Sequence, residues 1–328
     1  MKRIYLLAIV FITTSSYSQT NFQINEKTDF VKEVASIMMD YYVDKEMSLV
    51  LSEQLLRQLE LGIYDNVNSR DEFAKLIQDQ CLIISNDKHI QLRFIPEEDK
   101  IKEGSEVNAG TINKGENYGF DRVRVFEDLK IGRVKINEFQ KNKKAKEKID
   151  EIFESFSEME SVIIDLRECT GGSAYMVNYV MSYFVDTEPI KYLSIFNRYR
   201  NVNKDFYTLG NNKIPKEKRL LKQKLYILTS NFTFSAAEGF AYHLKHLKRA
   251  TIIGETTGGG ANMVMPVGWQ LEDENGNFTI GKYEVLVPII KVTSPFTGTN
   301  WEGVGVKPDI ETIADDAWEE AFELAGSK

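Results

Sequence analysis

The sequence predicts an α/β protein in which a small helical N-terminal domain precedes a core built around a largely parallel sheet. Apolar residues recur at every third or fourth position through residues 27–82, which is the pattern of amphipathic helices. From about residue 118 onward, short apolar strands alternate with helical segments. Strand–helix–strand order of this kind is typical of parallel sheets covered by helices, so we expect the core to be of the α/β class.

Three apolar stripes define the helical N-terminal domain, which we place at residues 19–95. The stripes consist of Phe30, Val31, Val34, Ile37, Met38 and Tyr41, then Leu51, Leu55, Leu56, Leu59 and Ile63, and then Phe73, Leu76 and Ile77. Residues 96–117 are charged, contain glycine and show no hydrophobic period. We expect a linker or an excursion from the fold there.

Alternating strands and helices account for most of the core, residues 118–328. Strands are expected at residues 122–126, 130–136, 161–166, 225–228 and 250–254, and helices at 143–156, 174–184, 236–247 and 314–325. Asn142 is a suitable N-cap for the first of these helices. Residues 264–292 alternate like a hairpin, with a Glu-Asn-Gly-Asn turn at 274–277.

The first 18 residues predict a secretory signal peptide. Lys2 and Arg3 precede a short apolar run, and Ser16 and Ser18 are small residues at the positions that signal peptidase reads, so we expect cleavage after Ser18. No segment of the chain reaches the roughly 18 consecutive apolar residues that a membrane-spanning helix needs. We therefore expect an exported protein, periplasmic or extracellular, with no integral membrane segment after cleavage.

Charge and cysteine content narrow the choice of partners and of cross-links. The chain of 328 residues has a formal net charge of −8, which disfavours nucleic acid and anionic membranes because both are negatively charged. The two cysteines are Cys81 and Cys169. One disulfide between them is an alternative, but each lies close to apolar residues outside any cysteine-rich scaffold, which favours two buried free thiols.

A strand-to-helix turn at residues 229–238 presents Ser235 as a candidate nucleophile. The N–H groups that open a helix lack intrahelical partners and carry the positive end of the helix dipole. An oxyanion formed beside Ser235 would therefore meet donors already in place. Serine is also a preferred N-cap residue, and capping is the simpler role when this segment is considered alone.

A serine nucleophile needs a base, and the chain offers three histidines as candidates. His89 stands where a polar turn meets an alternating strand. His243 and His246 lie three positions apart on the helix after Ser235, where a metal pair is conceivable. No further cysteine or histidine lies nearby and Lys245 would repel a cation, so we expect these two to be surface or half-buried residues and no metal to be bound.

Two glycine-rich turns and one acidic loop complete the set of candidates. The pair Gly171-Gly172 follows a buried strand and lets the backbone approach a ligand closely. The three glycines at residues 258–260 indicate a loop, and no Lys-Ser/Thr pair follows, so the phosphate-binding P-loop pattern is absent. Glu302 stands between a tryptophan and a glycine; it is either a half-buried partner for an imidazole or an exposed loop acid.

Together these segments resemble the C-terminal processing (tail-specific) serine protease family, in the branch of the tricorn core protease and the modules of interphotoreceptor retinoid-binding protein. The resemblance lies in Asp87-Lys88-His89, residues 163–167 with Gly171-Gly172, residues 233–238, residues 254–261 and residues 298–309. They occur in the family's order across residues 87–309. The resemblance implies a crotonase/ClpP-like ββα superhelix core with a helical N-terminal cap.

The same resemblance implies a role for each matching residue. It makes Ser235 the nucleophile, His89 the general base and Glu302 the carboxylate that supports the catalytic network. The oxyanion hole corresponds to the N–H of Ala236 and one from Gly171 or Gly172. A peptide or protein substrate is implied, without a metal or an organic cofactor.

Three departures from the family's pattern affect these expectations. The tail-specific branch places a lysine about 25 positions after the serine, where this chain has Gly260, so the histidine-based arrangement is the candidate. The tricorn branch has a serine directly before its histidine, where this chain has Lys88; a cation there is expected to lower the pKa of His89. Many relatives carry a PDZ domain between the two halves, and the roughly 40 residues between His89 and Lys130 are too few for one.

The predicted function is that of an exported serine peptidase that works through an acyl-enzyme on Ser235. Two alternatives stay open. One is a non-catalytic binding protein for apolar ligands or peptides on the same fold, as in the retinoid-binding modules, and the other is an esterase for small acyl substrates. The sequence does not predict the substrate sequence or the oligomeric state.

Overall fold

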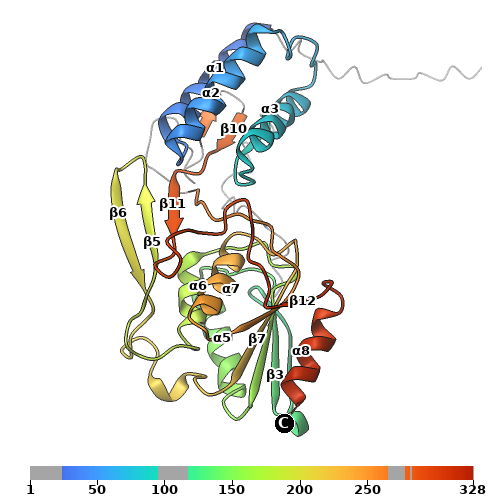
Figure 1. The fold of residues 1–328 in the computed structure, drawn as a ribbon, viewed down its shortest axis with the longest axis vertical. Coiled ribbons are helices and arrows are strands. Elements are labelled where there is room, and N and C mark those ends of the chain that lie inside the picture. The colour runs from blue at the N-terminus through green and yellow to red at the C-terminus, as the bar shows by residue number, and fades with distance from the viewer. Residues whose placement is uncertain (1–23, 95–116, 265–277, 281–282, 328) are drawn as a thin grey trace, which may run out of the picture.

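A computed structural model describes residues 24–94, 117–264, 278–280 and 283–327, and Figure 1 shows its fold. The predicted signal peptide, residues 96–116 of the expected linker and the expected turn at 274–277 lie outside these residues. Within the described ranges, no helix combines the length and the apolar character that crossing a membrane requires.

Three helices form the N-terminal lobe, as the apolar stripes predicted: α1 (Ile24–Tyr41), α2 (Lys45–Glu60) and α3 (Arg70–Ser85). Side-chain caps fix where two of them begin. Asp44 accepts the N–H of Met47 at 2.9 Å at the start of α2, and Ser69 accepts the N–H of Glu72 at 3.3 Å at the start of α3.

The N-terminal lobe also contains a small antiparallel sheet whose strands come from both halves of the chain. Its order is β1 (Gln91–Phe94), β10 (Tyr283–Leu286), β9 (Phe278–Ile280). Tyr283 and Val285 of β10 are buried in the same apolar cluster as Phe30 and Phe73 of the helices. The helical lobe is thus completed by residues some 200 positions away in the chain.

A six-stranded sheet forms the centre of the core, and it confirms the predicted α/β class. Its order is β12 (Ile310–Glu311), β8 (Thr251–Gly254), β7 (Lys224–Thr229), β4 (Ser161–Asp165), β3 (Ile131–Ile136), β2 (Phe120–Phe126). All neighbours are parallel except β2 and β3, which are antiparallel. The carboxyl ends of the central strands therefore lie at one edge, where the loops to the helices begin.

Helices cover both faces of this sheet (Figure 1). The helices α5 (Lys143–Ser155), α6 (Ala174–Met181) and α7 (Ala236–His246) share an apolar core with Val162 and Ile164. On the other face, α8 (Ala317–Gly326) packs on Ile163. All five residues of β4 are buried, and its centre, Val162 to Ile164, is apolar without interruption. Successive strand residues point to opposite faces, so burial on both sides explains this apolar centre. Asn142 caps α5 as predicted, accepting the N–H of Ala145 at 2.7 Å.

A third sheet was not predicted. It consists of β11 (Ile290–Thr293), β5 (Lys191–Asn197) and β6 (Val202–Tyr207), joined antiparallel. No sequence pattern predicts β6, because five of its six residues are exposed and no apolar alternation results. The single hairpin expected over 264–292 is wrong in one respect: β10 joins the helical lobe, whereas β11 pairs with β5.

Both cysteines are buried and free, as expected, and they belong to different apolar clusters. Burial raises the pKa of each thiol to about 12, so neither is a reactive thiolate near neutral pH.

Candidate active site

Ser235 occupies a strained turn between β7 and α7. Its backbone has φ 54° and ψ −120°, the conformation of the first central residue of a type II′ turn, which glycine normally occupies. Strain of this kind costs about 1–3 kcal/mol and persists where the surroundings fix it. The turn places the Ser235 side chain at the N-terminus of α7, at the carboxyl edge of the sheet.

His89 reaches Ser235 across the boundary between the two lobes. Its Nε2 lies 3.1 Å from Ser235 Oγ, within hydrogen-bond distance. The imidazole is mostly buried, and the ring of Phe234 packs against it with centroids 4.8 Å apart. No local pattern predicts this contact, because 146 positions separate the two residues; the family resemblance is what paired them.

Burial lowers the pKa of His89, and the Asp87 carboxylate acts in the opposite direction. The direction agrees with the one expected from Lys88, but the main cause is burial. The ammonium of Lys88 instead donates to the carbonyl of Gly258 in the glycine-rich loop. An imidazole with a lowered pKa stays neutral and able to accept a proton.

Two carboxylates lie beside this imidazole. Glu302 Oε2 accepts the N–H groups of Ala261 and Asn262, both at 2.7 Å, while its Oε1 is buried without a hydrogen-bond partner among the described residues. Burial, and then the neighbouring Asp87 carboxylate, raise the pKa of Glu302 to about 7. The sequence singled out Glu302 but assigned no role to Asp87, which the structure places next to His89.

The three groups Asp87, His89 and Glu302 each have a ligand-type atom within 4.8 Å of the other two. Histidine and carboxylates are common metal ligands, so this is where the described part of the chain brings such groups together. The His89 ring of this cluster is also the one whose Nε2 lies beside Ser235 Oγ. The histidine pair predicted to lie at or near the surface is corrected in part: His243 is buried against Tyr192.

A backbone N–H without an acceptor lies next to Ser235. No described residue accepts the N–H of Ala236, which opens α7. A Cβ built on Gly171 would lie 3.0 Å from this nitrogen, so a glycine keeps the space in front of it open. The Gly171 carbonyl accepts from Phe139 at 2.9 Å. Because a trans peptide directs N–H and C=O to opposite sides, the N–H of Gly172 points away from Phe139.

Glu238 holds the nucleophile turn and the glycine-rich loop together. It is fully buried, and burial raises its pKa. One oxygen accepts the N–H of Ser235 at 2.8 Å and that of Gly260 at 2.8 Å, and the other accepts the N–H of Gly259 at 2.7 Å and the hydroxyl of Thr257. The sequence signal that could have revealed it is the Ser-x-x-Glu spacing of a capping box.

Replacing Glu238 by glutamine is expected to lower the free energy of unfolding by about 1–3 kcal/mol and to slow the reaction at Ser235 at least tenfold. An amide NH₂ would face N–H donors where a carboxylate oxygen now accepts them. Denaturant unfolding and the rate of covalent labelling at Ser235 measure the two effects. Glu255→Gln is the matched control, since Glu255 accepts a single backbone N–H, that of Asn231 at 3.1 Å; equal losses in both variants would contradict this role.

The position of Gly260 explains how the histidine fits. A Cβ built there would lie 2.7 Å from His89 Cε1 and closer still to the Phe234 ring. The imidazole and the phenyl ring therefore occupy the space that a side chain at position 260 would need.

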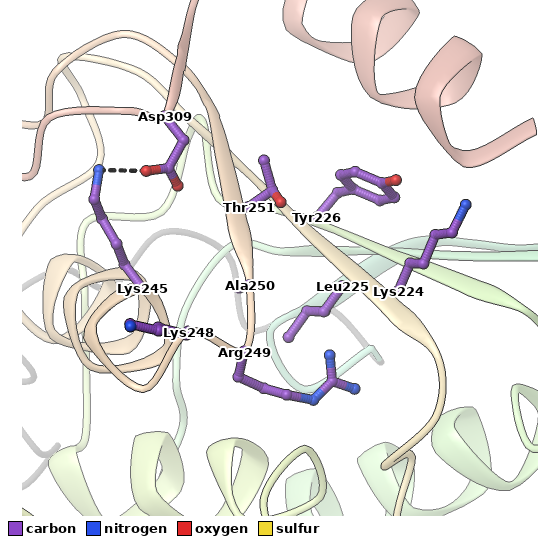
Figure 2. A pocket seen from close by; sticks show the side chains of 9 residues that line it. All are labelled: Lys224, Leu225, Tyr226, Lys245, Lys248, Arg249, Ala250, Thr251 and Asp309. Atoms are coloured by element: carbon purple, nitrogen blue, oxygen red, sulfur yellow. Dashed lines mark ion pairs between the residues drawn. The ribbon is translucent and has the colours of Figure 1, made fainter. Parts of the chain in front are cut away.

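Another cavity in the α/β part of the chain has four basic residues, Lys224, Lys245, Lys248 and Arg249, among those that line it (Figure 2). Lys224 and Thr251 place it at the start of β7 and β8, whereas Ser235 follows the end of β7. Three of its charged groups are used within the fold: Lys245 pairs with Asp309 at 2.8 Å, and Arg249 donates to two backbone carbonyls. Nothing in this cavity provides a nucleophile beside a base.

The family model of peptidase family S41 matches residues 130–312. The chain belongs to peptidase family S41. A curated relative, carboxyl-terminal-processing peptidase 2 (chloroplastic) of Arabidopsis thaliana, is 28% identical over 183 residues, which cover 55% of this chain. The match spans 31% of that relative's length. The family matches the resemblance seen in the sequence.

Solved structures of proteases share the fold. A candidate peptidase from Parabacteroides merdae superposes with a TM-score of 0.64 at 19% identity and covers 94% of this chain and 98% of its own. The photosystem II D1 C-terminal processing protease gives 0.54 at 15% identity, covering 92% and 98%. The tricorn protease gives 0.60 at 14% identity, covering 92% of this chain and 37% of its own. These likenesses confirm the predicted α/β fold with its helical N-terminal domain.

Proposed function

We propose that this S41 chain is a serine peptidase in which Ser235 is the nucleophile and His89 the general base. The observation that carries the proposal is the 3.1 Å separation between Ser235 Oγ and His89 Nε2. The backbone of Ser235 is strained, with φ 54°, which indicates that its placement serves a function. A serine that only capped a helix would require neither the strain nor the imidazole.

The geometry supports acyl transfer in two halves. Ser235 Oγ attacks the peptide carbonyl carbon while His89 Nε2 takes its proton, and the carbonyl oxygen becomes an oxyanion. The N–H groups of Ala236 and Gly172 are the proposed donors to it, and each such donor lowers the barrier by about 3–4 kcal/mol. The C–N bond then breaks as His89 returns the proton to the leaving amine. Water next attacks the ester, its proton goes to His89 and then to Ser235 Oγ, and the free enzyme is restored.

Labelling with a fluorophosphonate tests the nucleophile. We expect the protein to be labelled stoichiometrically and Ser235→Ala to be unlabelled. Label that persists in the mutant assigns the nucleophile to another residue. A wild-type protein that is folded and stays unlabelled would favour the binding-protein alternative, and turnover of small esters without peptide cleavage would favour the esterase.

We expect kcat/KM to rise with pH through about 7, the pKa to which Glu302 is raised. His89 is already neutral in this range because burial holds its pKa below the usual 6.5. Above about 7 the Glu302 carboxylate is charged and stabilises the imidazolium formed during attack. The acid side of this pH profile reports the coupled titration of the groups around His89. In Glu302→Gln, lower activity should come with an acid limb moved below pH 6.5; a limb that stays near 7 in this variant would exclude Glu302 as its source.

We also propose the substrate class and the location. The curated relative is named for carboxyl-terminal processing, so C-terminal segments of proteins are the first substrates to examine. Residues 1–18 have the composition of a signal peptide, which supports an exported, periplasmic or extracellular protein. N-terminal sequencing of the protein from its native host checks this; a chain that starts at Gln19 would agree, and one that keeps Met1 would not.

A further inference from the structure

We propose that Tyr42 and Asp87 are positioning residues for His89, so that the end of the first helix sets where the base stands. The inference rests on the proposed function, because His89 must be the base of the reaction for its placement to affect the rate. It concerns two residues that neither the sequence motifs nor the family match singled out for a role.

Both carboxylate oxygens of Asp87 accept hydrogen bonds. It is fully buried, and its Oδ1 accepts the backbone N–H of His89 at 2.9 Å and lies 3.8 Å from the ring Nδ1. Its Oδ2 accepts the hydroxyl of Tyr42 at 3.1 Å. The carboxylate cannot rotate without losing one of these bonds, so a shift of Tyr42 is passed to His89.

Tyr42 is itself fixed to the core. It directly follows α1 and is buried, and burial together with the Asp87 carboxylate raises its pKa, so the phenol stays protonated and donates. The guanidinium of Arg198, just beyond β5, donates to the carbonyls of Met39 and Tyr42. The N–H of Val43 donates to the carbonyl of Pro288 at 2.9 Å. Tyr42 and its neighbours therefore contact both the core and the His89 segment from the end of α1.

His89 has little else to orient it. Its Nδ1 is buried without a hydrogen-bond partner among the described residues, so no acceptor fixes the ring through that nitrogen. The ring is held by Phe234 on one side and by the backbone that Asp87 anchors. A misplacement of a catalytic group by about 1 Å can lower the rate by a factor of about 100. A small change at Asp87, which holds the His89 backbone, is therefore expected to have a large effect.

Fluorophosphonate labelling of Ser235 in Tyr42→Phe and Asp87→Asn tests the inference. We expect the labelling rate to fall about tenfold in Tyr42→Phe and about a hundredfold in Asp87→Asn. Tyr179→Phe is the matched control, because Tyr179 is also buried and also donates to a carboxylate, Asp150 Oδ1 at 2.6 Å. The control should label at the wild-type rate.

The pH dependence separates positioning from a merely structural loss. The groups around the ring are the carboxylates of Asp87 and Glu302 and the Ser235 hydroxyl, while the Lys88 ammonium is directed to a backbone carbonyl. Asp87 raises the pKa of both His89 and Glu302, so its neutral replacement should move the acid limb of labelling to lower pH. A general loss of folded protein would lower the amplitude and leave the limb in place.

The outcomes are distinct from those that decide the proposed function. If wild type labels and both folded variants label at its rate with an unmoved limb, the positioning role is wrong. If wild type does not label at all, the peptidase proposal fails, and NMR titration of the imidazole decides the coupling. A His89 resonance that shifts its titration in Asp87→Asn but not in Tyr179→Phe supports the contact; one that shifts in neither overturns it.

Discussion

Replacing His89 by glutamine is expected to lower kcat/KM for peptide cleavage by about 10⁶-fold, as loss of a catalytic base does in other serine peptidases. Its Nε2, the proposed base, lies within hydrogen-bond distance of Ser235 Oγ, and position 260 is Gly260 where the tail-specific branch has its lysine. Glutamine keeps a polar side chain of similar reach but cannot accept and return a proton. Steady-state kinetics on a fluorogenic peptide, with labelling at Ser235, measure the loss.

His246→Gln is the control for this experiment. His246 is half-buried on α7, the helix that Ser235 opens, and its ring packs on Tyr242 at a centroid distance of 4.3 Å. It should keep wild-type activity within about twofold, since surface substitutions away from a site have small effects. His89→Gln that retains a few per cent of activity, while Ser235→Ala has none, would mean that another group takes the proton.

Replacing Gly171 by alanine is expected to lower kcat by about 10²–10³, the cost of losing one oxyanion donor. The added methyl would lie 3.0 Å from the backbone nitrogen of Ala236 and 3.0 Å from Ser235 Cβ, in the space where the oxyanion is expected. The residue also has φ +119°, a conformation that strains any L side chain, so some loss of stability accompanies the loss of rate.

Gly298→Ala separates these two effects. Gly298 also has a positive φ, +70°, but a Cβ there meets nothing within 4 Å. It carries the backbone strain without the collision, so we expect a lower melting temperature with an unchanged kcat. If Gly171→Ala changes only stability, as Gly298→Ala should, then Gly171 does not border the oxyanion site.

Most elements of the core could be predicted because the signals for them come from residues close together in the sequence. The apolar run of β4, the Asn142 cap of α5 and the stripes of the N-terminal helices each depend on residues close together in the chain. The third sheet and the join between β1 and β10 depend on pairing over long separations, which leaves no local period. Exposed β6 lacks even an apolar alternation.

In the candidate site, too, the residues in local motifs could be predicted, but the contacts between distant segments could not. Ser235 and His89 were found through motifs that surround them, and the structure places them in contact. Asp87 stands inside one of those motifs, yet its contact with Tyr42 depends on where α1 ends relative to the His89 segment. Glu238 follows Ser235 at capping-box spacing, but its bonds to Gly259 and Gly260 arise only when two distant loops meet.

The crowding around Gly260 bears on how such a site can change during evolution. A side chain at this position would strike the His89 imidazole and the Phe234 ring, so a lysine cannot be added while the histidine is in use. With His89 as the proposed base, removing the histidine first would leave Ser235 with no base. On this proposal an inactive intermediate separates the two kinds of base in either order of mutation. This epistasis would keep a lineage that has adopted the histidine from returning to the lysine, even though both act on the same serine.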